Sequence, residues 1–161
     1  MVEDLGHYKY RGARALVLLH EREQHHFLNV WREAKAANVA LPETTDEDYE
    51  SLETLLRHVL RAGRGYIVWI CKQLDLPDPD IRPAPEPDVI EAEADGYLEH
   101  LLERWRLPLA EVPEERFEPA TYVSNWGTPY CVEAMLEHAV MHPVRHAFQL
   151  EELMSASRPT L

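Results

Sequence analysis

Three histidines at four-residue spacing, His138, His142 and His146, lie near the end of the chain. Each residue of an α-helix turns by about 100°, so residues four apart are displaced by only about 40° around the axis. The three imidazoles would therefore lie along one slowly turning line, where neighbouring members could chelate a single ion. Neutral imidazole is a common metal ligand, so this spacing points to metal chemistry.

The apolar residues of the same segment separate the three histidines. The sector that faces the core is defined by Val132, Met135, Ala139, Leu150 and Leu153. His146 falls inside this sector, His142 lies at its edge, and His138 is about 40° further toward solvent. A buried imidazole without a partner costs roughly 1–3 kcal/mol, and a metal ion would satisfy it. The alternative interpretation is a surface or hydrogen-bonded pair, since two ligands do not complete a tetrahedral shell.

A third ligand must come from another segment, and His58 is the best candidate. It sits on the flank of the apolar face of its own helical segment. The alternative for His58 is an interfacial histidine bonded to a carboxylate or a carbonyl. His20 competes as a ligand, because with Gln24 it interrupts the inward stripe of the first helical segment. We favour His20 and Gln24 as polar residues that line a pocket, and Tyr66 as a pocket residue or a packed core residue.

Helical periodicity dominates the chain and predicts an all-α four-helix bundle that forms a single domain over residues 1–161. The four segments run from about Tyr10 to Ala37, from a capping box at Thr44 and Glu47 to the proline-rich PDPDIRPAPEP, from Asp88 to Leu107, and from Thr128 as N-cap to about Met154. No segment has a convincing strand pattern.

A long loop from Pro108 to Gly127 separates the third and fourth helical segments. A loop of about 20 residues in a compact domain suggests a functional covering segment. Trp126 near its end could wall a cleft, although we favour an ordinary packed aromatic for it. Substrate would enter near this loop.

The composition excludes several classes of partner. The chain has 29 acidic and 16 basic residues, which gives a formal charge of −13. Such a domain repels nucleic-acid phosphates and anionic membrane surfaces. It lacks the run of roughly 20 apolar residues that spans a bilayer, and it shows no signal peptide. Two cysteines are too few for a disulfide framework. We expect a cytoplasmic protein with reduced thiols.

The order and separation of the histidines resemble those of the DinB/YfiT-like superfamily, whose members are regarded as metalloenzymes. LLRHVLRAGRGYIVWI resembles the helix-two motif and supplies His58, whereas LEHAVMHPVRHAFQLEEL resembles the helix-four motif. His142 and His146 match the histidine pair of that motif, and Gln149 matches the glutamine that follows it.

Two features depart from the family pattern. The family often has Arg-Gly after the second histidine of the pair, where this chain has Ala147 and Phe148. Pro143, directly after His142, removes a backbone donor and predicts a kink. The kink leaves open whether His138 or His142 reaches the ion.

The resemblance implies an often dimeric four-helix bundle with a zinc or nickel ion held by three histidines beside a cleft. It also implies small-molecule substrates and low-molecular-weight thiols such as bacillithiol or mycothiol. The ion would activate a thiol or water for attack on a small electrophile, in a transferase or hydrolase reaction. A non-catalytic metal- or ligand-binding sensor and a purely structural bundle are the alternatives. A ferritin-like di-iron site is excluded, because only Glu23 and His26 show the required Glu-x-x-His spacing.

Overall fold

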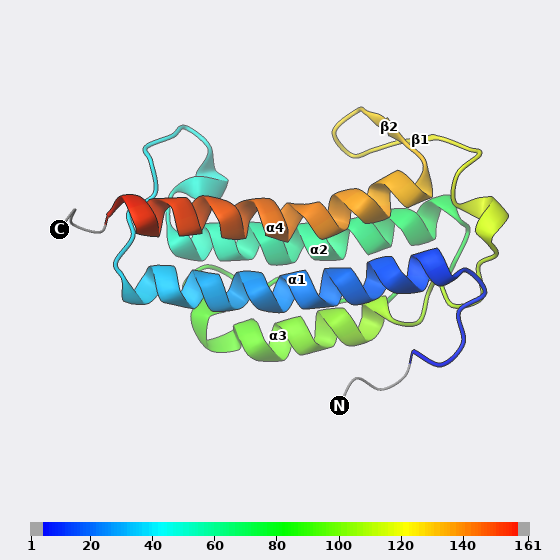
Figure 1. Cartoon of the computed structure of the whole chain (residues 1–161), viewed down its shortest axis with the longest axis horizontal. Coiled ribbons are helices and arrows are strands. Elements are labelled where there is room, and N and C mark those ends of the chain that lie inside the picture. The colour runs from blue at the N-terminus through cyan, green and yellow to red at the C-terminus, as the bar shows by residue number, and fades with distance from the viewer. Residues whose placement is uncertain (1–4, 158–161) are drawn as a thin grey trace.

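Four long helices run side by side in the computed structural model, which describes residues 5–157 (Figure 1). They are α1 (Arg11–Ala36), α2 (Leu52–Gln73), α3 (Ile90–Trp105) and α4 (Val132–Ala156). α4 packs most extensively against α1 and also contacts α2, while α3 packs against α2. The protein is therefore mostly helical, as the periodicity predicted. Within the described range, no helix has the combined length and apolar character needed to cross a bilayer.

One hydrophobic core holds the helices together, and large side chains from all four contribute to it. The connector between α3 and α4 also contributes: Phe117 is 1% exposed, and Leu109 and Val112 are buried as well. Burial of these side chains ties the connector to the bundle, because returning them to water would cost about 25 cal/mol for each Å² of apolar surface. The long loop is thus anchored at several points.

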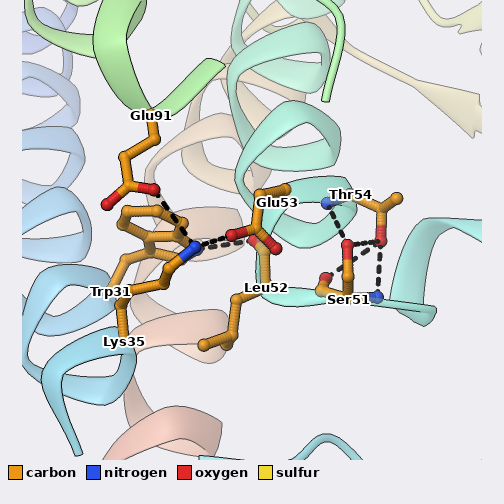
Figure 2. Close-up of polar contacts among 7 residues, drawn as sticks. All are labelled: Trp31, Lys35, Ser51, Leu52, Glu53, Thr54 and Glu91. Carbon is orange, nitrogen blue, oxygen red and sulfur yellow. Dashed lines mark hydrogen bonds and ion pairs between the residues drawn. The ribbon is translucent and has the colours of Figure 1, made fainter. Parts of the chain in front are cut away.

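The start of α2 is fastened to α1 by the contacts in Figure 2. The Trp31 indole donates a hydrogen bond of 2.6 Å to the Leu52 carbonyl. Lys35 forms ion pairs with Glu53 and Glu91, from α2 and α3. These contacts fix the position of α2 along the axis of the bundle, and therefore also the position of His58, which belongs to α2.

The N-terminal cap of α2 differs from the one that the sequence predicted. Thr44 and Glu47 do not form its capping box; Glu47 instead begins a short 3-10 helix, η1 (Glu47–Tyr49). The capping box consists of Ser51 and Thr54, whose side chains each bond the other's backbone N–H (Figure 2). The η1 segment therefore remains outside α2 and folds against its side, where it contacts α2.

The connector before α4 contains two short strands that the sequence pattern did not predict, β1 (Tyr122–Val123) and β2 (Pro129–Tyr130). They pair antiparallel as a hairpin, so Pro129 belongs to a strand and Cys131 is the N-cap of α4. The connector also holds a 3-10 turn, η2 (Glu114–Arg116). In Figure 1 the hairpin and η1 lie on the same side of the bundle, near opposite ends of α4. α4 itself continues through Pro143 as one helix.

Candidate metal centre

Three histidines from two helices converge between η1 and the hairpin. The possible ligand nitrogens of His58, His142 and His146 all lie within 4.8 Å of one another. The Nε2 atoms of His58 and His142 are 3.0 Å apart. The ring centroids of His58 and His146 are 5.2 Å apart. The predicted meeting of α2 and α4 histidines is therefore confirmed, and such a group could hold a metal ion.

The outer nitrogens of two of these rings have protein partners that fix their tautomers. His58 Nδ1 lies 3.0 Å from Asp48 Oδ2, and His146 Nδ1 lies 2.9 Å from Gln149 Oε1. A carboxylate or amide oxygen only accepts hydrogen bonds, so each Nδ1 of the neutral rings must carry the proton. The proton-free Nε2 of each ring is then available as a ligand. Partners of this kind orient metal-binding histidines in many proteins.

The spacing fits one small divalent ion after a modest adjustment. Two imidazole nitrogens at about 2.1 Å from a tetrahedral zinc ion are about 3.4 Å apart. The ligand nitrogens of the cluster lie within 4.8 Å of one another, so the widest pair would close by on the order of 1 Å to hold the ion. Three nitrogen ligands also leave at least one coordination position for water or substrate. The donor set could therefore hold a divalent ion without closing its coordination shell.

Burial keeps two of the rings neutral. Desolvation lowers the pKa of His142 to about 2, and the nearby His146 and His58 act in the same direction. Desolvation, followed by the influence of His58, lowers the pKa of His146 to about 4. Both rings are uncharged at pH 7, the form that binds a metal. His142 Nδ1 is buried without a hydrogen-bond partner in the described part of the chain, so packing against Tyr66 orients this ring.

The other predicted site residues lie outside this cluster. His138 stacks on Trp126, with centroids 5.1 Å apart, so it is His142 that joins the group. His20 and Gln24 of α1 are fully buried, and the His20 ring stacks on that of Trp105 from α3, with centroids 3.8 Å apart. They hydrogen-bond to each other and line neither of the cavities beside the cluster. They are core residues in this structure.

Two cavities border the histidine cluster. One, of about 350 Å³, is lined by His58 and His142 themselves, by Tyr66 as predicted, and by Trp126 from the hairpin. The other, of about 650 Å³, lies toward η1 and reaches the cluster through Tyr49 and Gln149. Its remaining lining is mostly apolar. The long connector thus forms part of a cleft wall, and Trp126 is a wall residue and not a packed core aromatic.

Asp48 and Tyr49 are site residues that periodicity did not reveal. Asp48 bonds His58 and also pairs with Arg61 at 3.0 Å. The Tyr49 ring lies 5.7 Å from that of His58 and 5.8 Å from that of His146. Both belong to η1, a single 3-10 turn. A turn has no repeating pattern, so the only signal in the sequence was an acidic run shortly before a helix.

Asp48→Asn is expected to weaken zinc binding about tenfold, the lower end of what loss of such an orienting partner costs. Asparagine keeps an acceptor oxygen for His58 Nδ1 but removes the negative charge. Titration of metal-free protein with zinc against a competing chelator would measure the change. Glu47→Ala, an exposed neighbour in the same turn, is the matched control and should bind zinc like wild type. Equal affinities for all three proteins would contradict an orienting role for Asp48.

Comparisons of this chain with protein-family models, with curated proteins and with solved structures find no match.

Proposed function

We propose that this protein is a metal-dependent enzyme of the DinB/YfiT-like type, in which His58, His142 and His146 hold a zinc or nickel ion. The observation that carries the proposal is the convergence of the three imidazoles with their outer nitrogens engaged by Asp48 and Gln149. The Nε2 atoms of His58 and His142 lie 3.0 Å apart, within hydrogen-bond distance of each other and close enough to share one ion. The order of the histidines along the chain resembles that superfamily, as described above.

The proposed reaction is attack by a low-molecular-weight thiol, or by water, on a small electrophile. A divalent ion in such a site lowers the pKa of bound water to about 7 and favours the thiolate form of a thiol. The residues of the chain would supply the rest. His58 and His142 line the cavity of about 350 Å³, so a substrate there would sit beside the ion. Tyr66 lines the same cavity, and desolvation raises its pKa to about 12, so it stays protonated at neutral pH.

Two cavities on either side of the cluster suit a reaction with two reactants. The larger one, near Gln149, has room for a thiol of moderate size, and the smaller one for the electrophile. The two cysteines of the chain are free. Burial raises the pKa of Cys71 to about 11, which makes it a poor nucleophile. The Cys131 sulfur accepts a hydrogen bond from the Ala134 N–H at the start of α4, and neither cysteine lines the two cavities, so the proposed nucleophile is external. The cytoplasm, where such thiols are kept reduced, is the proposed compartment.

The experiment has two stages. Protein purified without a histidine tag is expected to contain, or to take up, about one zinc or nickel ion per chain by elemental analysis. The loaded protein is then mixed with chloroacetamide and each of cysteine, bacillithiol and mycothiol, and consumption of the thiol is followed. A metal-dependent rate of thiol consumption with at least one of the thiols would support the proposed enzymatic function. Full metal loading without any thiol-dependent or hydrolytic rate would favour a sensor, and no metal binding would overturn the proposal.

A further inference from the structure

The smaller cavity beside the histidines has a wall of aromatic rings from three different elements. Tyr66 and Trp69 come from α2, and Trp126 comes from the hairpin. The ring of His138 from α4 stacks on the Trp126 ring. The Tyr66 and Trp126 rings are 6.4 Å apart and nearly perpendicular. Tyr66 in turn meets the His142 ring at 5.7 Å. The aromatic wall therefore extends from the cavity mouth to the candidate metal ligands.

Trp126 is held in place although nearly half of its surface, 49%, is exposed. The Trp69 indole donates a hydrogen bond of 3.1 Å to the Val123 carbonyl, which fastens the hairpin to α2. Within the turn, Gly127 has φ +87° and donates to the Ser124 carbonyl at 3.0 Å. A large apolar ring fixed at the edge of a cavity offers a ready surface for a ligand, because no conformational freedom is lost when the ligand binds.

The chemistry of the cavity narrows the kind of ligand. Tryptophan and tyrosine rings favour other aromatic rings in stacked or edge-to-face contact. Arg61 also lines the cavity but is paired with Asp48, whereas a divalent ion at the histidines would add two positive charges. A cationic ligand would be repelled there, whereas a neutral or anionic one would not. The cavity of about 350 Å³ is near the lower limit for ligand sites, so one ring fits it better than a fused system.

We propose that this cavity binds an aromatic ring of the substrate, uncharged or anionic, against the indole of Trp126, with the reacting atom of the substrate toward His58 and His142. This inference rests on the proposed function, because it assigns the electrophile of that reaction to an aromatic class. It makes Trp126 a specificity-determining residue.

The test uses hydroxamates, which bind zinc through two oxygens and so place their side group beside the metal. Binding of acetohydroxamate, benzohydroxamate and cyclohexanecarbohydroxamate to the zinc-loaded full chain is measured by calorimetry. The last two differ in having a flat or a saturated ring of similar size. Benzohydroxamate is expected to bind about three- to tenfold more tightly than the cyclohexane compound, the range of one aromatic contact. Trp126→Leu is expected to abolish this preference and Trp126→Phe to keep it.

Phe148→Leu, which changes another exposed aromatic outside the cavity, is the matched control and should retain the full preference. Equal affinity for the two ring compounds, or a preference that survives in Trp126→Leu, would overturn the aromatic assignment while leaving the metal centre intact. If the protein binds zinc but the zinc-loaded protein binds none of the hydroxamates, the aromatic assignment is overturned as well. If the chain binds no zinc at all, the proposed function fails, and the aromatic assignment fails with it.

Discussion

Replacing His142 with alanine is expected to weaken zinc binding on the order of a thousandfold, because one of three ligands is lost and structural zinc sites gain about 10–16 kcal/mol from their full set. The His142 Nε2 atom lies 3.0 Å from that of His58, and the centroid of the His142 ring lies 4.7 Å from that of His146. Competition with a chelator of known affinity at pH 7 would measure the change. His58→Ala should have an effect of the same order.

His138→Ala is the matched control, since it removes an imidazole one helical turn earlier on the same helix. It should keep the wild-type affinity and stoichiometry, because His138 stacks on Trp126 outside the cluster. Circular dichroism of each variant would show that the helices remain folded. If His138→Ala lost the metal and His142→Ala kept it, the ligand assignment would be wrong and the ion would lie one turn away.

Acidification is expected to destabilise the protein through His20, which is fully buried. Desolvation lowers its pKa from 6.5 to about 3. Below pH 6.5 the unfolded chain therefore binds a proton that the folded chain refuses, so the free energy of unfolding falls as the pH falls. Above the unfolded pKa this contribution is fully present. The loss attributable to one such histidine is about 2 kcal/mol between pH 7 and pH 5.

Comparison with His20→Gln isolates this effect, because glutamine does not titrate. Urea unfolding of the metal-free proteins at pH 7 and pH 5 should show a loss for wild type that exceeds the loss for His20→Gln by about 2 kcal/mol. His25→Gln, a change at an exposed position of the same helix, should behave like wild type. Equal losses for wild type and His20→Gln would show that His20 accepts a proton in the folded protein.

The helices and the histidine register could be predicted because both follow from local geometry. A period of 3.6 residues sets which side chains share a face, so the inward placement of His146 and the edge position of His142 could be read from neighbouring apolar residues. The structure agrees: the His142 and His146 residues are 6% and 5% exposed. α4 continues through Pro143 as one helix, and His142 is the member of the His138–His142 pair that joins the cluster.

The parts of the candidate site that could not be predicted lie in segments without a repeating pattern of apolar residues. Asp48 orients His58 from a single 3-10 turn, and Trp126 reaches the cleft from a hairpin whose strands have two residues each. Their positions depend on tertiary contacts, such as the bond from Trp69 to the Val123 carbonyl. The Thr44 capping box failed for a related reason: several residues before α2 can act as caps, and packing selects among them.

The pairing of His58 with His142 joins two points 84 residues apart in the chain. An ion shared by these residues would act as a removable cross-link between α2 and α4. Because such an ion would bind the folded arrangement and not the unfolded chain, its binding free energy would add to the stability of that arrangement. Occupancy by the ion would thus raise the free energy needed to separate α4 from α2, and its loss would lower it again.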